Sequence, residues 1–162
     1  EWSLRLLAHA RRRRLRPDVI SYNASITACG KGQEWAFALH HLGAMALSTL
    51  RPNATTCNAA ITACERGGQW RAALRLLDGM GAHGLRARTD TFNATMAACA
   101  KAGQTPTALE LLEEMRGLEL APDLVSFNTA IGACARGHQW QQSLELLEAL
   151  RGRRFAPDIV SY

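Results

Sequence analysis

Cysteine and histidine are the side chains in this sequence that could ligate a metal ion or act as a nucleophile, and the chain has five of each. Their spacing supports neither chemistry, because the sequence contains no CxxC, HxxxH or HxE motif. Cys57 and Cys64 share a predicted helix face but are two turns apart, roughly 10 Å. We therefore predict no catalytic residue, no metal and no cofactor, with the cysteines as small apolar packing residues in a reducing compartment and the histidines at the surface.

Polar and basic side chains instead recur at a fixed step of 35 residues. A row of cations follows this step and would line one edge of a repeated structure, where it could contact phosphates. The alternative is that each cation favours the C-terminal end of a helix. A net charge of +5 and a pI near 9.3 also favour an anionic partner. The predicted phosphate contacts are Lys31, Arg66, Lys101 and Arg136.

The same period predicts two helices in each unit. The segment from Ser21 to Cys29 indicates a short first helix, and a turn rich in glycine follows it. The segment from Trp35 to Met45 has the apolar spacing of an amphipathic second helix, and the proline near each seam stops it. We expect the tryptophans to pack between units. A Ser or Thr is expected to cap each first helix, at Ser21, Thr56, Thr91 and Ser126.

One such hairpin buries only part of its apolar face, so the units must stack. The predicted fold class is all-α, an α-solenoid (a right-handed superhelix) of stacked helix-turn-helix repeats. The chain starts without Met and stops in the middle of the pattern, so we expect a fragment of a longer protein. The predicted units are the second helix of a truncated repeat (1–18), four complete repeats (19–53, 54–88, 89–123 and 124–158) and the start of a further repeat (159–162).

The segment Val19-Ile-Ser-Tyr-Asn-Ala-Ser-Ile-Thr-Ala-Cys29, with its gapless 35-residue copies, resembles the pentatricopeptide repeat (PPR) motif. Tetratricopeptide repeats differ, because they run at 34 residues and start from another Trp-containing pattern. The resemblance implies binding of single-stranded RNA, with one base addressed by each repeat. The implied base-selecting pairs are Asn23 with Asn53, Asn58 with Arg88, Asn93 with Asp123, and Asn128 with Asp158.

Family behaviour implies a pyrimidine (C or U) for the Asn/Asn pair and uracil for the two Asn/Asp pairs, in 5′ to 3′ order along the chain. The pair of Asn58 and Arg88 falls outside the pattern and is left unspecified. The family also places an apolar residue between bases near the start of each unit. Ile20 and Val125 match this wedging position, whereas Thr55 and Asp90 depart from it.

The expected function is a single-stranded RNA-binding module for RNA processing, stability, editing or translation in a mitochondrion or chloroplast. We expect a monomer with no membrane association, because no segment has the roughly 18 consecutive apolar residues of a membrane span. The alternative is a protein-interaction scaffold of the tetratricopeptide kind, which would bind a peptide in its concave groove or other partners on its surface. An enzyme is not predicted, since the zinc-deaminase elements and a phosphate-binding glycine-rich loop are missing.

Overall fold

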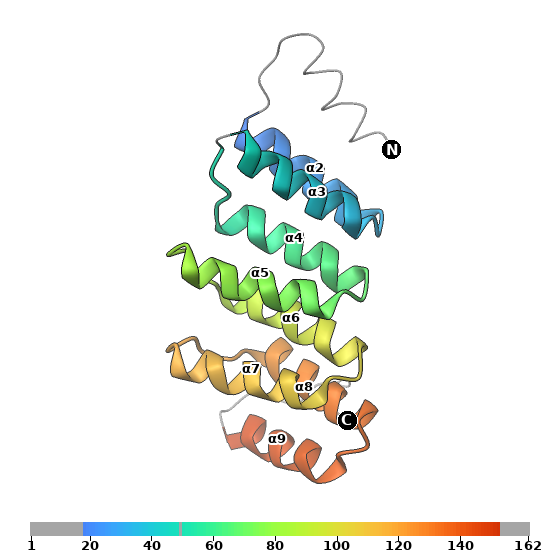
Figure 1. The fold of residues 1–162 in the computed structure, drawn as a ribbon. Coiled ribbons are helices and arrows are strands. Elements are labelled where there is room, and N and C mark those ends of the chain that lie inside the picture. Colours follow the sequence, from blue (N-terminus) through green and yellow to red (C-terminus); the bar gives the residue numbers. More distant parts are fainter. Residues whose placement is uncertain (1–17, 49, 153–162) are drawn as a thin grey trace. The chain divides into compact units, whose positions relative to one another are not determined.

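The computed structural model describes residues 18–48 and 50–152, and all regular elements in these ranges are α-helices. The helices alternate between a first and a second helix of each repeat (Figure 1). The first helices begin 35 residues apart and are α2 (Val19–Lys31), α4 (Ala54–Arg66), α6 (Thr89–Lys101) and α8 (Leu124–Arg136). The second helices are α3 (Trp35–Leu47), α5 (Trp70–Ala82), α7 (Thr105–Gly117) and α9 (Trp140–Gly152).

These helix pairs confirm the predicted all-α solenoid of helix-turn-helix repeats. The described residues form two compact units that divide between Arg86 and Ala87. The first unit holds α2 to α5 and the second holds α6 to α9. The hand of the superhelix and the exact repeat boundaries remain predictions. Residues 1–17 of the predicted truncated repeat (1–18) and the predicted start of a further repeat (159–162) lie outside the described residues, as does the end of the fourth repeat.

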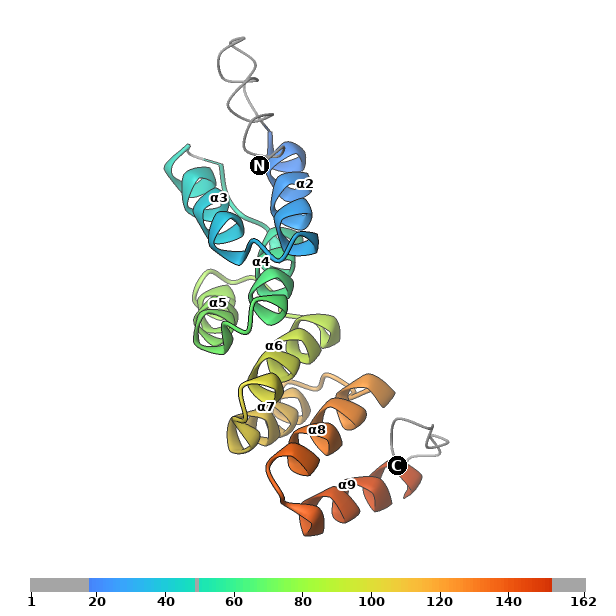
Figure 2. The same ribbon diagram turned by 90° about the vertical axis from the view of Figure 1, so that its right-hand side faces the viewer.

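Within the first unit, α2 packs against both α3 and α4, and α4 packs against α5. Figure 2 shows α3 and α5 on the same side of the α2 and α4 pair. Small side chains allow the two first helices to approach closely, since a Cβ atom added to Gly30 would lie 3.2 Å from the Cβ of Ala63. Ile26, Ala60 and Ala63 are fully buried there. The first helices are therefore the main layer in which the repeats of this unit meet, and α3 also contacts α4.

The second unit repeats this arrangement. Helix α6 packs against α7 and α8, and α8 packs against α9. Its core holds Phe92, Met96, Met115 and Phe127, each at most 1% exposed. Burial of these apolar side chains, at about 1.5–3 kcal/mol each, is what a single hairpin could not achieve alone.

A left-handed residue closes the turn between the first and the second helix of every repeat. The four positions are again 35 residues apart, at Gln33, Gly68, Gly103 and His138, with φ between 56° and 72°. Glycine adopts this conformation without steric cost, whereas Gln33 and His138 adopt it at a cost. The turn geometry is thus common to all four repeats although the residue type is not.

The predicted burial of the cysteines is confirmed, whereas the predicted exposure of the histidines fails at one position. All five cysteines are buried, which confirms their prediction as packing residues. Burial raises the pKa of Cys64 and of Cys99 to about 11, so these thiols stay neutral. The expectation of surface histidines is wrong for His41, which is 4% exposed and lies edge-on to the Tyr22 ring, 6.5 Å between ring centroids. His41 falls on the inner face of an almost wholly apolar helix, and that position outweighs the polar character of the side chain.

Candidate functional site

The residue just before the first helix of a repeat caps that helix with its side chain in three of the four described repeats. Asp18, Asn53 and Asp123 lie just before α2, α4 and α8. In each case a side-chain oxygen accepts a hydrogen bond from the backbone N–H three residues later, at 2.8, 2.9 and 2.9 Å. This bond satisfies one of the N–H groups that the first turn leaves without an intrahelical partner.

The prediction that Ser21, Thr56, Thr91 and Ser126 are the N-caps is therefore wrong. These residues stand three positions inside their helices, at the site that completes a capping box. Thr56 Oγ1 accepts from the backbone N–H of Asn53 at 3.2 Å, and Ser126 Oγ accepts from that of Asp123 at the same distance. The signal was present in the sequence, because an Asp or Asn followed three residues later by Ser or Thr is a reciprocal capping pattern. The helices consequently start earlier than Ser21 and its counterparts.

In the first unit this cap brings together the two residues that were predicted to select the first base. Thr56 is fully buried, and its Oγ1 lies 2.6 Å from Asn23 Oδ1 in α2 and 2.9 Å from Asn53 Oδ1. A single hydroxyl thus connects an asparagine of one repeat with the cap of the next. We call this group of three side chains the Asn53 seam.

In the second unit the equivalent group contains Asn93, Ser126 and Asp123, and we call it the Asp123 seam. Ser126 Oγ lies 2.7 Å from Asn93 Oδ1 and 2.9 Å from Asp123 Oδ1. In addition, Asn93 Nδ2 donates to Asp123 Oδ1 at 3.1 Å. The structure therefore places the third predicted selecting pair in direct contact.

The Asp123 carboxylate is ionised in this setting. Partial burial acts to raise its pKa, but hydrogen bonds from the Ser126 backbone, from Asn93 and from the Ser126 hydroxyl outweigh burial and leave the pKa below the ordinary aspartate value. All the hydrogen bonds described for this carboxylate end on Oδ1. Its second oxygen, Oδ2, accepts none of these bonds.

The pair of Asn58 and Arg88 behaves differently from the other pairs. Arg88 precedes α6, where its side chain has no acceptor to offer the helix. Asp90 takes over this role, because its Oδ1 accepts from the Thr91 N–H at 2.9 Å. The Arg88 guanidinium forms an ion pair with the same carboxylate, with Nε 3.2 Å from Oδ1. The hydrogen bond from Arg88 lowers the pKa of Asp90, and Asp90 raises that of Arg88.

The fourth selecting pair is only partly described. Asn128 is half-buried in α8, at the position that Asn93 has in α6. Asp158 lies outside the described residues, so the geometry of this pair is left as a prediction.

The predicted wedging residues project into solvent. Ile20 and Val125 stand in the first turns of α2 and α8, and 75% and 57% of their surfaces are exposed. Thr55 and Asp90 occupy the same position in the other two repeats, and both are exposed.

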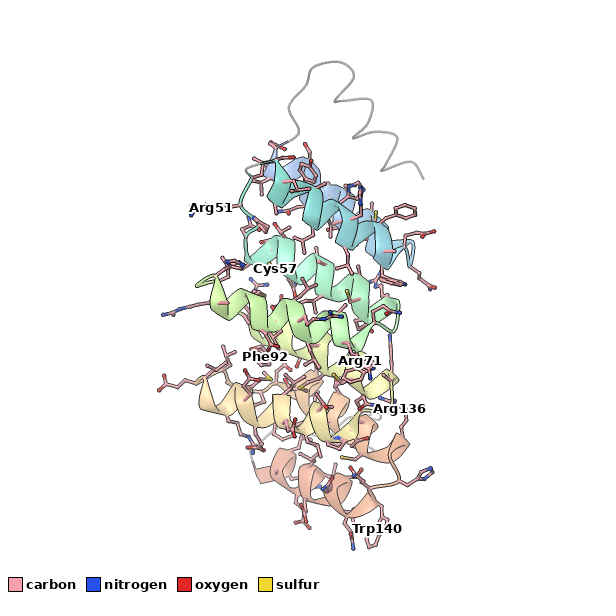
Figure 3. The ribbon with its side chains drawn as sticks, in the orientation of Figure 1. Arg51, Cys57, Arg71, Phe92, Arg136 and Trp140 are labelled. Carbon is pink, nitrogen blue, oxygen red and sulfur yellow. The ribbon has the colours of Figure 1, made fainter. Side chains whose placement is uncertain are left out.

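The row of predicted phosphate contacts ends the first helices. Lys31, Arg66, Lys101 and Arg136 are the last residues of α2, α4, α6 and α8, and all four are exposed. Arg136 also has a structural contact, since its Nε donates to the carbonyl of Ala100 at 3.0 Å (Figure 3). It thereby satisfies a carbonyl near the C-terminal end of α6. This contact agrees with the alternative explanation for the cations, in which each favours the C-terminal end of a helix.

The tryptophans at the starts of second helices divide into two groups. Trp35 packs against the backbone at Gly67, where an added Cβ would lie 2.6 Å from Trp35 Cγ and 2.9 Å from its Cβ. This contact confirms the predicted packing role for Trp35. Trp140, in the last repeat that the structure describes, is 66% exposed at the start of α9 (Figure 3).

Two further structural observations concern classes of function. No three residues among His, Cys, Asp and Glu lie together as metal ligands within residues 18–48 and 50–152. No helix in the described part of the chain has the length and apolar character needed to cross a membrane.

Three family models match this chain. A pentatricopeptide repeat domain model matches residues 42–102, a PPR repeat family model matches residues 87–136, and a PPR repeat model matches residues 125–155. No curated protein matches it. The three models together cover residues 42–155, which is most of the chain.

Solved structures with a similar fold include the pentatricopeptide repeat protein PPR10 in complex with an 18-nt psaJ RNA element. That protein is 26% identical, with a TM-score of 0.84 over 98% of this chain and 23% of its own. The pentatricopeptide repeat protein PPR10 from maize is 27% identical, with a TM-score of 0.78 over 98% of this chain and 22% of its own. The PPR domain of Arabidopsis thaliana protein-only RNase P 1 in complex with tRNA has a TM-score of 0.85 over 98% of this chain and 84% of its own. At 17% identity, this likeness shows a common fold alone. This chain spans less than a quarter of PPR10.

Proposed function

Because this chain belongs to the pentatricopeptide repeat family, we propose that it binds single-stranded RNA, with each repeat addressing one base. Similar structures of that family in complex with RNA support the proposal. The chain acts in this proposal as a binding module and not as an enzyme. Repeats beyond these four would add further bases, as the greater length of PPR10 suggests.

The observation that carries the proposal is the Asp123 seam. It places an amide donor, Asn93 Nδ2, beside a carboxylate acceptor, with 3.1 Å between the nitrogen and Asp123 Oδ1. Uracil carries an N3–H donor next to a carbonyl acceptor, so its edge complements this pair. Cytosine would bring the unprotonated N3 towards the carboxylate, and two acceptors repel. We infer that the third repeat prefers uracil.

The Asn53 seam offers different chemistry. Both of its side chains are neutral amides, and their oxygens face the Thr56 hydroxyl. An amide can donate to or accept from a pyrimidine edge, so the first repeat is proposed to take C or U. Arg88 is held by Asp90 and presents no such edge, and the second base is accordingly left unspecified. Asn128 with Asp158 is proposed to take uracil, as the third repeat does.

Two further contacts complete the proposed mode of binding. Ile20 and Val125 are proposed to insert between bases, where stacking is worth on the order of 1–3 kcal/mol for each base. The cations that end the first helices are proposed to contact phosphates, which would make binding weaken with salt. Four bases give a modest total, so we expect this chain alone to bind weakly.

The polar seams favour RNA over the peptide-binding scaffold, because a peptide groove would need apolar or aromatic side chains at these positions. By family membership we propose a role in RNA processing, stability, editing or translation, in a mitochondrion or a chloroplast. We also propose that the chain is a monomer.

Fluorescence anisotropy of labelled RNA tests this function. One RNA carries pyrimidine-N-U-U within a purine background, and the control is poly(A) of equal length, each at low and at physiological salt. We expect tighter binding to the first RNA, weakened by salt. Asn128→Thr should alter the preference at the fourth base only. Equal binding to both RNAs, unmoved by this substitution, would reject base selection.

A further inference from the structure

The hydroxyl groups of Thr56 and Ser126 connect the predicted selecting side chains, although neither residue was predicted to select a base. We propose that they are positioning residues, which orient the amides of Asn23 and Asn93 so that the NH2 group is presented to the base. This inference rests on the proposed function, and it extends base selection to a third residue of each pair.

The first step is to identify the acceptors of the single hydroxyl proton of Thr56 and of Ser126. Each hydroxyl accepts a backbone N–H from the cap residue at 3.2 Å, so its own proton remains for donation. Two acceptors lie within reach of Ser126 Oγ, and the asparagine oxygen is the nearer, at 2.7 Å against 2.9 Å. For Thr56 the corresponding distances are 2.6 and 2.9 Å. In both seams the asparagine Oδ1 is thus the nearer of the two oxygens that share the hydroxyl proton.

The second step is the amide orientation that this donation imposes. With Oδ1 bound to the hydroxyl, the Asn93 NH2 points to the other side and meets Asp123 Oδ1 at 3.1 Å. A flipped amide would place its oxygen against that carboxylate, and two acceptors would then face each other. Ser126 and Asp123 thus select the same orientation from opposite ends of the amide.

The third step is the pattern that results for a base. An NH2 group has two protons, and one of them is used by Asp123. The other remains for a carbonyl oxygen of the base, while Asp123 Oδ2 remains for an N3–H. Without the hydroxyl, one of the two restraints on the amide disappears, and the pair distinguishes uracil from cytosine less well.

A purely structural role is the competing explanation, since Thr56 and Ser126 are both fully buried. Ser21 separates the two explanations. It occupies the same position in α2, and its N–H and its hydroxyl both donate to Asp18 Oδ1, at 2.8 and 2.7 Å. The hydrogen bonds described for Ser21 reach Asp18 alone, so in this chain its substitution tests the effect of the cap by itself.

The test measures binding of RNAs that differ only as U or C at the third base, or only as U or C at the first base. Ser126→Ala should lower the U-to-C ratio at the third base by roughly threefold to tenfold, which is the range that one hydrogen bond supports. It should leave the ratio at the first base unchanged. Ser126→Thr restores the hydroxyl and should retain the wild-type ratio, and Ser21→Ala should leave both ratios unchanged. Thermal melting of each variant checks folding.

A Ser126→Ala protein that melts normally and keeps the wild-type ratio at the third base would overturn the positioning role. A lower affinity for all of these RNAs with an unchanged U-to-C ratio at the third base, in step with the melting temperature, would also overturn it and leave a structural role. A wild-type chain with no preference between U and C at the third base would contradict the proposed function itself, so the two failures are distinguishable.

Discussion

The Asn53 seam and the Asp123 seam have the same geometry and differ in one functional group. Each has a cap residue, a buried hydroxyl three positions later and an asparagine from the preceding first helix, with hydroxyl-to-amide distances of 2.6 and 2.7 Å. In one the cap is an amide, and in the other it is a carboxylate whose Oδ1 also accepts from Asn93 Nδ2. The helix cap therefore fixes the position of Asn53 and of Asp123, whereas the group at that position can be either an amide or a carboxylate.

The two units also differ in how the second helix of one repeat meets the next. Trp35 covers Gly67 in the first unit, whereas in the second unit Thr105 covers Gly137 and donates to the Ala133 carbonyl at 3.0 Å. The cations that end α4 and α8 also differ in their hydrogen bonds. Arg136 donates to Ala100, and among the hydrogen bonds in the described ranges Arg66 has no equivalent.

Gly67→Ala should have the largest effect on stability. Gly67 has φ of −85°, so the backbone tolerates alanine, but the new Cβ would overlap Trp35 near its ring attachment. We expect a loss of about 1–3 kcal/mol in the free energy of unfolding, measured by urea denaturation. The double variant Trp35→Ala with Gly67→Ala should lose less than the sum of the single losses. Additive losses would show that the two residues do not clash.

Arg136→Ala should have an intermediate effect. It removes the hydrogen bond to the Ala100 carbonyl, and we expect a loss of about 0.5–1.5 kcal/mol, whereas the matched variant Arg66→Ala should change the unfolding free energy little. If both cations contact phosphates, either substitution should lower the slope of log affinity against log salt by about 0.7. An unchanged slope for both variants would remove these residues from the proposed phosphate row.

The smallest expected effect is a difference between the two seams in how much stability is lost at low pH. The folded pKa of Asp123 is lowered, so its stabilising contribution is complete above the ordinary aspartate pKa and is lost as pH falls through the folded value. Asn53 does not titrate. Asp123→Asn should match the wild type at neutral pH, because Asn and Asp cap helices about equally well. It should then lose less stability than the wild type near pH 3, by less than about 1 kcal/mol. A larger acid loss in the variant would contradict this assignment.

The sequence predicted the period, the helix pairs and the packing cysteines. The base-selecting pairs stay predictions, although the structure brings Asn93 and Asp123 into contact. The sequence misplaced the helix starts, because Ser21 and Thr56 can also cap a helix. The residue three positions earlier, Asp18 or Asn53, is the one that accepts the hydrogen bond. Other features could not be predicted from spacing. The burial of His41, the ion pair of Arg88 with Asp90 and the bond from Arg136 to Ala100 depend on side-chain directions across neighbouring turns, and a one-dimensional repeat does not contain these.

The most direct test of the account is to exchange the one group by which the seams differ. U-to-C preference would be measured by anisotropy at the first and the third base, for the wild type, Asn53→Asp, Asp123→Asn and the double exchange. The account predicts that Asn53→Asp acquires a preference for uracil at the first base and that Asp123→Asn relaxes it at the third, each by roughly fivefold or more, the range of a base contact. The double exchange should move the preference from the third base to the first. Preferences that stay in place in all three variants, in proteins that remain folded, would contradict base selection by these seams.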